Sequence, residues 1–556
     1  MTRPTFLLAF VFALILAISP FNASAADIND EGAQRLKIIF EELISYQKSI
    51  SELAEDGKLI YQGDVIVEPS DEYYAVTLPH VSILYPKGQR LELGIVSVNA
   101  VPHDQEGQWK MTVAMPTPII LFDKSGAPAL QLDIGSQLSA GIWHEELEYF
   151  TKLDARYQDI KIESPDGTFR TAIAEAEILY DLNEDDQGRW SGPLKGTIRK
   201  IAMNFEKTGG TITMKEAKLG VELFSYIPQA IKDYKEKLIA MAEAGSDGNV
   251  SSQHITGLYN MIVELLGNAG DGFTAQYEVS DLDITRPVDP DTESEEKRLE
   301  SFHFGKLSMG FDLTGFLNNQ VKLALRFGFN DLKAPPSDDE SMKGIMPTTG
   351  HIDVQLNDIP YQKIADLGRN SIAGKAGMVH MATFALKIPA ILSEAGTTMT
   401  FTDNHFGNDA YHVNANGKIR ADISALNSAT ADIRLTAKGL EQLKANMALE
   451  GDDPLNENAQ NFQKIAAQLQ ILQVLAAKEK DGLGNLIHIL EFEMNKQGEM
   501  LMNGQDIRLL FDGRAADRAK PQEPEAAPEQ APAPEAAPTP QPQQVEPAAP
   551  AEDTAP

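Results

Sequence analysis

The chain of 556 residues contains no cysteine. A bacterial lipoprotein needs an acylated cysteine at its cleavage site, so we predict that this protein is not one. Without thiols the chain cannot form disulfides or bind a metal through thiolates. Its stability must therefore come from packing, and the chain is safe from thiol oxidation in an oxidising compartment.

Basic residues are few, with 48 Lys and Arg against 81 Asp and Glu, which gives a formal net charge of −33. Such a field repels the phosphate backbones of nucleic acids. We therefore predict no nucleic-acid partner. The simplest role of the negative charge is to keep the protein in solution.

Long apolar runs are missing after the N-terminus. An apolar run from Phe6 to Ile18 follows Arg3 and ends at Pro20, just before Ala23-Ser24-Ala25. This pattern is typical of a cleavable signal peptide, and the run is shorter than the ~20 residues of a membrane span. We predict a signal peptide over residues 1–25, a periplasmic location in a Gram-negative envelope and no transmembrane span after cleavage. An uncleaved anchor is the alternative.

Apolar and polar residues alternate over most of the stretch from Lys58 to Leu223. Leu91, Leu93 and Ile95 show the period of two that a strand with one dry face requires. Clusters of Gly, Pro, Asp and Asn interrupt the alternation at hairpin spacing. The pattern predicts roughly ten antiparallel strands in meander order.

Alternation resumes after a predicted helical hairpin, for example from Val321 to Phe329. Apolar residues at helical spacing over residues 36–44 predict an opening helix that ends at Asp56-Gly57, and similar spacing predicts further amphipathic helices between the strands. The predicted fold class is α+β: β-rich, with large antiparallel meander sheets and amphipathic helices packed on them. We expect β-rich domains over residues 26–270 and 271–514.

Three segments share a strand that passes into an amphipathic helix: Lys218–Pro228, His351–Pro360 and Asp432–Leu440. They suggest a degenerate internal repeat. Chance similarity between short alternating runs is the alternative.

Residues 515–556 consist largely of Pro, Ala, Glu and Gln. Such a segment buries too little apolar surface to offset the entropy lost on ordering. We predict a disordered, extended tail that acts as an envelope spacer or as an inert solubilising segment.

One set of motifs resembles a serine acyl-enzyme. Ser45-x-x-Lys48, Ser97-x-Asn99 and Lys207-Thr-Gly match in order the S-x-x-K, S-x-N and K-T-G elements of penicillin-binding proteins. In that hypothesis Ser45 is the nucleophile, and Lys48 and Lys207 assist it. Against it, the Ser45 helix opens the mature chain, Ser97 lies in a strand pattern and Lys207 lies in a turn pattern.

Asp403, His405, Asp409 and His412 carry metal-binding side chains within ten residues. They would form a divalent-metal site if the intervening turn folded them together. The turn composition explains the same residues without a metal. No G-x-S-x-G or H-E-x-x-H motif occurs in the chain, and we predict no cofactor.

The order of elements resembles an uncharacterised alphaproteobacterial periplasmic family. The resemblance rests on the signal peptide and opening helix, the Gly63-Asp64-Val65 strand, Gly439–Leu443 and Gly498–Gln505. The family has no known activity, so the resemblance implies location and architecture only.

The sequence favours a non-enzymatic envelope protein that binds an apolar ligand such as a lipid, or an envelope partner, on a sheet face. Many strands with one apolar face have few helices to cover them. A closed core is the alternative role for the same side chains, and the acyl-enzyme and an outer-membrane barrel are the alternative functions. The sequence leaves the ligand and the oligomeric state open. The face would be lined by Trp109, Met111, Met115, Phe302, Phe304, Phe311, Phe327 and Phe329.

Overall fold

The structure is a computed structural model. Division of the chain by internal contacts gives one unit of residues 1–506 and a second of residues 507–556, and the description below concerns the first. The structure describes residues 28–53, 57–105, 107–145, 147–234, 237, 252–287, 299–334, 344–372, 377–452 and 459–507. The predicted signal peptide and the predicted tail lie outside these residues.

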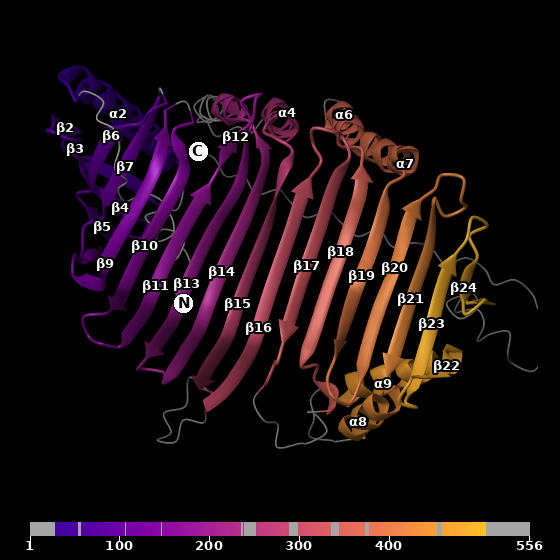
Figure 1. Cartoon of the computed structure of the whole chain (residues 1–556). Helices are drawn as coiled ribbons and strands as arrows, with labels where there is room; N and C mark the ends of the chain where they lie inside the picture. Colours follow the sequence, from indigo (N-terminus) through magenta and orange to yellow (C-terminus); the bar gives the residue numbers. More distant parts are fainter. Residues whose placement is uncertain are drawn as a thin grey trace, which may run out of the picture. The chain divides into compact units, whose positions relative to one another are not determined.

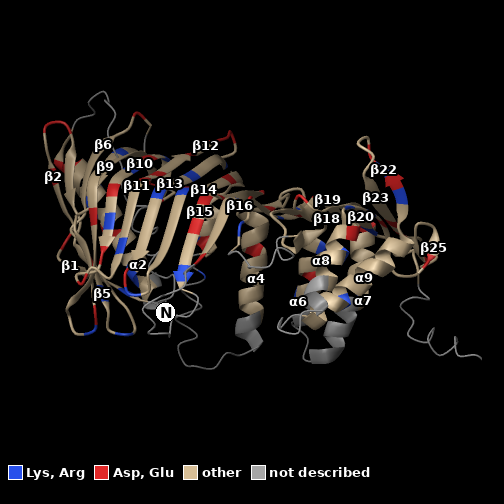
Figure 2. Ribbon diagram, turned by 90° about the horizontal axis from the view of Figure 1, so that it is seen from below, with Lys and Arg blue, Asp and Glu red and all other residues tan. Residues whose placement is uncertain are grey.

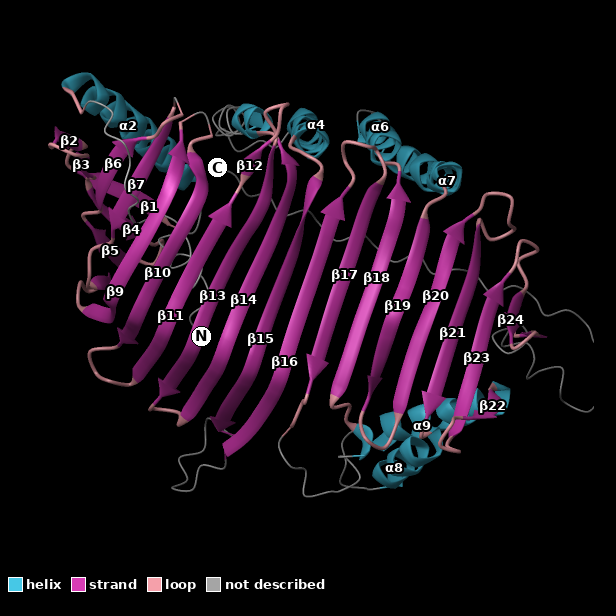
Figure 3. Ribbon diagram, viewed as in Figure 1, coloured by secondary structure: helices cyan, strands magenta, loops and turns pink. Residues whose placement is uncertain are grey.

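An antiparallel meander forms most of this unit (Figures 1 and 3). From Pro128 onward the long strands pair with their neighbours in sequence order. The meander strands are β9 (Pro128–His144), β10 (Tyr149–Glu163), β11 (Phe169–Asp181), β13 (Trp190–Phe205), β14 (Gly210–Tyr226), β15 (Gly272–Pro287), β16 (Leu299–Thr314), β17 (Val321–Asn330), β18 (Thr349–Ile359), β19 (Thr398–Gly407), β20 (His412–Ala421), β21 (Ala429–Lys438) and β23 (Leu486–Met494).

Short strands line the far edge of β23. Strand β22 (Ala477–Lys480) pairs with one half of that edge and β24 (Met500–Met502) with the other. Strand β25 (Gln505–Asp506) follows β24, and β12 (Asn183–Glu184) is a two-residue partner of β13. Short edge strands leave little unpaired backbone exposed.

The first eight strands do not follow meander order. They are β1 (Lys58–Gln62), β2 (Ile66–Pro69), β3 (Tyr74–Thr77), β4 (His80–Leu84), β5 (Arg90–Gly94), β6 (Ser97–Pro102), β7 (Gln108–Ala114) and β8 (Ile119–Phe122). One edge of β9 pairs with β8 at its start and with β7 near its end. From β8 the pairing continues through β5 and β4 to β1, and from β7 through β6 and β3 to β2. Since β9 has 17 residues, its edge is long enough for both partners.

The helices lie at the ends of the strands (Figure 1) and on one side of the long sheet (Figure 2). Among the described residues, no helix is both long enough and apolar enough to cross a membrane. The opening helix α2 contains the apolar residues 36–44 and ends at Leu53, just before the predicted stop at Asp56-Gly57. Its first turn is capped where Asn29 Oδ1 accepts the amide of Gly32 at 2.9 Å. The helices are α2 (Asp30–Leu53), α4 (Ser252–Asn268), α6 (Tyr361–Ile372), α7 (Gly377–Ala395), α8 (Leu440–Asp452) and α9 (Ala459–Leu475).

The main core lies between the long sheet and the N-terminal elements. Leu36 of α2 and Val98 of β6 belong to the same buried cluster as Tyr157, Ile173 and Ile201 of β10, β11 and β13. Gly32 lies so close to Tyr74 that a Cβ atom at this position would overlap the phenol ring. Over β9–β13, the apolar face of the sheet is therefore covered by the first part of the chain.

A row of left-handed residues crosses the sheet. Asp159 on β10, Lys200 on β13, Asp281 on β15 and Asp331 after β17 have φ between 48° and 54°. The alternation of buried and exposed side chains shifts by one residue where this row crosses each strand. On β11, for example, the next buried residue after Ile173 is Ala176, three positions along instead of two. Because paired strands shift together, the apolar side chains stay on the same face on both sides of the row.

The predicted boundary near residue 270 lies inside the continuous sheet. Strand β14, before that boundary, pairs with β15, after it, from Thr211↔Thr285 to Phe224↔Gly272. The two predicted β-rich domains therefore share one sheet. In the first helix of the predicted hairpin, residues 228–234 and 237 are described and are helical, and the second helix is α4.

Candidate ligand-binding face of the sheet

The strand register places one residue from each of five strands in a single row. Leu219 of β14 is opposite Tyr277 of β15, which is opposite Met309 of β16. Met309 is opposite Phe327 of β17, and Phe327 is opposite Ile352 of β18. Residues directly opposite in antiparallel strands project to the same face, so these side chains lie together.

The neighbouring rows on this face are also apolar. Because every second residue of a strand points to the same side, the register extends the surface in both directions along the strands. These rows are Val221–Ala275–Phe311–Leu325–Val354, Leu223–Phe273–Leu313–Leu323–Leu356, Ala217–Val279–Leu307–Phe329–Gly350, Met214–Leu282–Phe304 and Ile212–Ile284–Phe302.

The middle of this face is exposed. Met309, Leu325 and Ile352 have exposed fractions of 55%, 53% and 52%. Leu219, Tyr277 and Phe327 have exposed fractions between 39% and 47%. We define these six residues as the apolar strip: Leu219, Tyr277, Met309, Leu325, Phe327 and Ile352.

Helices border the strip at one end of the strands. Tyr361 of α6 donates its hydroxyl to the carbonyl oxygen of Val263 on α4 at 2.6 Å, and Tyr259 of α4 donates to Ala365 O at 3.2 Å. The ring of Tyr361 also packs edge-on against Phe316, which follows β16. These contacts hold α4 and α6 together beside the ends of β16 and β17.

A second helical layer lies at the opposite end of the strands (Figure 1). Leu440 and Leu443 of α8 form a buried cluster with Val413 of β20 and Ala437 of β21. The strip lies between this layer and the α4–α6 layer, where the central rows of β14–β18 remain exposed.

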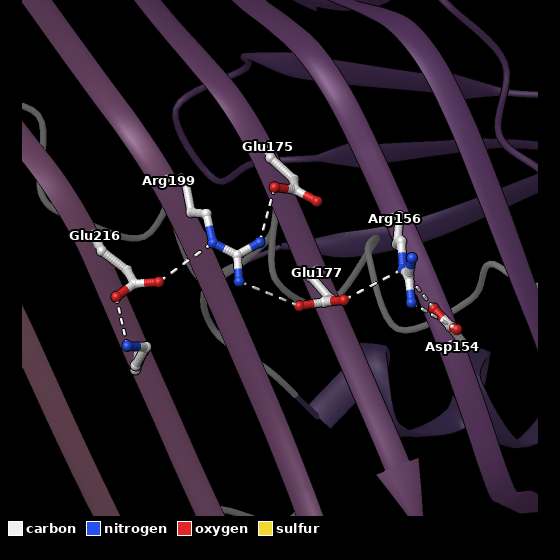
Figure 4. Close-up of polar contacts among 7 residues, drawn as sticks. Asp154, Arg156, Glu175, Glu177, Arg199 and Glu216 are labelled. Carbon is white, nitrogen blue, oxygen red and sulfur yellow. Dashed lines mark hydrogen bonds and ion pairs between the residues drawn. The ribbon is translucent and has the colours of Figure 1, made fainter.

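The opposite face of the sheet is polar and carries a ladder of ion pairs (Figure 4). Arg199 of β13 contacts Glu175 at 2.8 Å and Glu177 at 3.6 Å on β11, and Glu216 at 3.2 Å on β14. Arg156 of β10 continues the ladder to Glu177 at 3.2 Å. Hydrogen bonding to Glu175 raises the pKa of Arg199, and hydrogen bonding from Lys218 lowers the pKa of Glu216. This face is therefore suited to contact with water.

The predicted ligand-binding residues divide between two environments. Trp109, Met111 and Met115 have exposed fractions of 5%, 2% and 5% and belong to the main core. Phe327 lies in the strip, and Phe329 lies in the adjoining row. This corrects the expectation that all five line one open face: the strands β1–β8 and helix α2 fill the N-terminal part.

Phe302, Phe304 and Phe311 lie in rows beside the strip. Sequence reasoning missed Leu219, Tyr277, Met309, Leu325 and Ile352, because their alternation is the same as that of core strands. A count of helices against strands indicated that some surface stays open, but it did not locate that surface.

The residues of the acyl-enzyme hypothesis are exposed. Ser45 and Lys48 lie on the outside of α2, where their carbonyl oxygens accept hydrogen bonds from Ser49 Oγ and Ser51 Oγ. Lys207 lies in the turn between β13 and β14, and its Nζ atom is 3.3 Å from Asp166 Oδ2. The three residues therefore do not share an enclosed pocket.

Two of the four predicted metal ligands lie side by side on the polar face. The ring centroids of His405 and His412 are 5.5 Å apart, and His351 of β18 lies 5.7 Å from His405 on the other side. Asp403 offers its carbonyl oxygen to His405 Nδ1 at 3.0 Å, and Asp409 is exposed in the following turn. Within the described residues, no group of three or more His, Asp or Glu side chains is placed to hold a metal ion. The structure therefore gathers a histidine row, which includes the unpredicted His351, rather than the four predicted ligands.

Comparison of the chain with protein-family models, curated proteins and solved structures found no match.

Proposed function

We propose that this protein is a non-enzymatic periplasmic protein that binds a lipid acyl chain along the apolar strip. The observation that carries the proposal is the register of Leu219, Tyr277, Met309, Phe327 and Ile352, which forms a continuous exposed row across five strands. Contiguous exposed apolar surface on a protein marks a binding site or an aggregation hazard. An acyl chain that binds along the row removes its own apolar surface and that of the row from water. This burial stabilises the complex by ~0.8 kcal/mol per buried methylene.

The length of the row supports this ligand class. Neighbouring strands are spaced by ~4.8 Å, so five strands span ~19 Å. A bilayer core is ~30 Å thick and contains two layers of chains, so one acyl chain extends over ~15 Å. A single chain therefore fits within the row.

The chemistry of the row favours an acyl chain over a polypeptide segment. In the six apolar rows of β14–β18, the hydroxyl of Tyr277 is the one oxygen or nitrogen atom among the side chains. A peptide laid on this surface would lose hydrogen bonds from its backbone to water without replacement. A hydrocarbon chain has no such groups to satisfy.

We also propose that the strand-to-helix step is a degenerate repeat. Strand β18 ends at Ile359 and α6 begins at Tyr361, while β21 ends at Lys438 and α8 begins at Leu440. Each such step places a helix beside an end of the strands (Figure 3). In this interpretation the repeated helices border the strip, and its middle stays open.

The first experiment looks for the natural ligand. The protein would be released from the periplasm by osmotic shock and analysed by native mass spectrometry and lipid extraction. We expect an excess mass that matches an extractable acyl lipid. Protein that remains with the cytoplasmic fraction would contradict the proposed location.

The second experiment tests the site with diphenylhexatriene, a hydrocarbon probe that fluoresces when shielded from water. We expect the wild-type protein to bind the probe and Met309→Glu to bind it at least about tenfold more weakly, because the new carboxylate would have to lose water. Gln276→Glu is the matched control, since Gln276 is exposed on the polar face beside Tyr277. Equal binding by all three proteins, or binding by none, would contradict the site.

Size-exclusion chromatography distinguishes another occupant. If wild-type protein is a dimer and Met309→Glu is a monomer, a second copy of the chain covers the strip instead of a lipid.

A further inference from the structure

The position of Tyr277 divides the apolar strip unequally. Leu219 lies on one side of it, and the covered part of the sheet begins beyond that residue. On the other side, the row continues over Met309, Phe327 and Ile352. Three strand spacings of ~4.8 Å give ~14 Å on that side, close to the ~15 Å of an extended acyl chain.

The hydroxyl of Tyr277 needs an acceptor once a ligand displaces water. Tyr277 is 40% exposed, so water can reach its side chain in the free protein. An acyl chain that covers the strip removes that water, and an unsatisfied hydroxyl would then weaken binding. A ligand that carries an acceptor at this point of its chain avoids the penalty.

The surroundings of Tyr277 favour a neutral acceptor. The side chains of the six apolar rows of β14–β18 include no charged group. The neighbouring residues Gln276 and Glu278 project to the opposite face, because alternate residues of a strand do so. The carboxylate of a fatty acid bound here would lose its hydrating water and would find no cationic side chain to pair with. The carbonyl oxygen of an ester accepts a hydrogen bond without that penalty.

We propose that Tyr277 donates a hydrogen bond to the ester carbonyl of a bound acyl lipid. The acyl chain then runs over Met309 and Phe327 towards Ile352, and the alcohol part of the ester lies on the β14 side. This inference rests on the proposed function and adds to it the ligand class, the orientation and a specificity-determining residue. It predicts that neutral acyl esters bind better than free fatty acids or plain hydrocarbons.

The test is displacement of diphenylhexatriene by methyl oleate, oleate and octadecene, each delivered from cyclodextrin. These competitors share a long chain and differ in the group at its end. On wild-type protein we expect methyl oleate to displace the probe at a concentration about three- to tenfold lower than octadecene, the effect of one neutral hydrogen bond. Oleate should be no better than octadecene.

Tyr277→Phe retains the ring and removes the hydroxyl. In this variant we expect the ester advantage to disappear, so that methyl oleate and octadecene displace the probe at equal concentrations, each compared with the affinity of this variant for the probe. Tyr73→Phe, in the turn before β3, is the matched control and should behave as wild type.

The outcomes separate the two proposals. If the probe binds but the competitors are equal on wild-type protein, or the ester advantage persists in Tyr277→Phe, the role of Tyr277 is overturned while the strip remains a binding site. If oleate is the best competitor, the ester assignment is overturned. If the probe does not bind to wild-type protein, both proposals fail.

Discussion

Arg326 and Asp312 form a two-pronged ion pair between β17 and β16, with Nη1–Oδ1 and Nη2–Oδ2 distances of 2.9 and 2.6 Å. The pair lies on the polar face of the sheet. The next residue of β17, Phe327, lies in the apolar strip on the other face. One step along the strand therefore separates the charged layer from the proposed ligand-binding surface.

Removal of the Asp312 carboxylate should destabilise the protein. The side chain of Asp312 is 9% exposed and that of Arg326 is 26% exposed, so this pair is more shielded than a surface ion pair. We expect Asp312→Ala to lower the free energy of unfolding by about 1–3 kcal/mol, because it leaves a partly desolvated guanidinium. Asp353, 3.5 Å from Arg326 Nε, limits the loss.

Urea denaturation of Asp312→Ala would measure this loss. Lys152→Ala provides the control, because it removes an exposed ion pair with Asp181 and should change the free energy of unfolding by less than about 1 kcal/mol. Equal effects of the two substitutions would contradict the role given to the Arg326–Asp312 pair.

The histidine row should make stability depend on pH. Burial, together with the positive charges of His405 and Lys438, lowers the pKa of His412 below its ordinary value of 6.5. As the pH falls through 6.5, His412 takes up a proton in the unfolded chain before it does so in the folded chain. The free energy of unfolding should therefore fall below pH 6.5 and stop falling once the folded protein is also protonated.

Two variants test that prediction. His412→Gln should reduce the loss of stability between pH 7.5 and pH 5.5 in urea denaturation. His405→Gln removes a neighbouring charge and should raise the pKa of His412, as measured by NMR titration. A pKa of His412 that is unchanged in His405→Gln would contradict the proposed coupling of the two rings.

Trp109 and Phe327 should respond differently to truncation. Trp109 is buried, and its indole N–H donates to Glu145 Oε1 at 2.6 Å. We expect Trp109→Ala to lower the free energy of unfolding by about 3–5 kcal/mol. Phe327 is 39% exposed, so Phe327→Ala should cost only about 1–2 kcal/mol and should weaken binding of diphenylhexatriene.

Thermal unfolding and probe titration measure both properties of these variants. Trp109→Ala should bind the probe as wild type does at temperatures where it is folded. A loss of probe binding in Trp109→Ala with no loss in Phe327→Ala would place the binding surface in the N-terminal part instead.

The row of left-handed residues can be tested at Lys200, where φ is 54°. A β-branched residue is strongly disfavoured in this conformation. We expect Lys200→Val to lower the free energy of unfolding by about 1–3 kcal/mol. Lys161→Val, at an exposed position of β10, should have little effect, and urea midpoints would compare the two.

Alternation in the sequence predicted the antiparallel strands and the meander order of the long ones. Segments such as Val321–Phe329 carried enough apolar residues at a period of two to be assigned as strands, and β17 covers that segment. The order of β1–β8 could not be predicted in this way. It depends on both β7 and β8 pairing with one edge of β9, a choice between partners distant in sequence.

Continuity of the sheet across the predicted domain boundary also escaped prediction. The helical hairpin predicted between Leu223 and residue 270 resembled the end of a domain. Pairing of Leu223 with Phe273 carries the same sheet past the intervening helical segment. Local pattern specifies a strand but does not specify which distant strand completes its hydrogen bonds.

The sequence by itself determined that Met111 and Met309 each belong to the apolar face of a strand, because period-two alternation depends only on neighbouring residues. Only the tertiary structure decided that Met111 is buried at 2% exposure while Met309 remains 55% exposed. The difference depends on what packs over each strand. Strands β1–β8 and helix α2 form the core around Met111, whereas the helices near Met309 border the ends of the strands and leave their middle open.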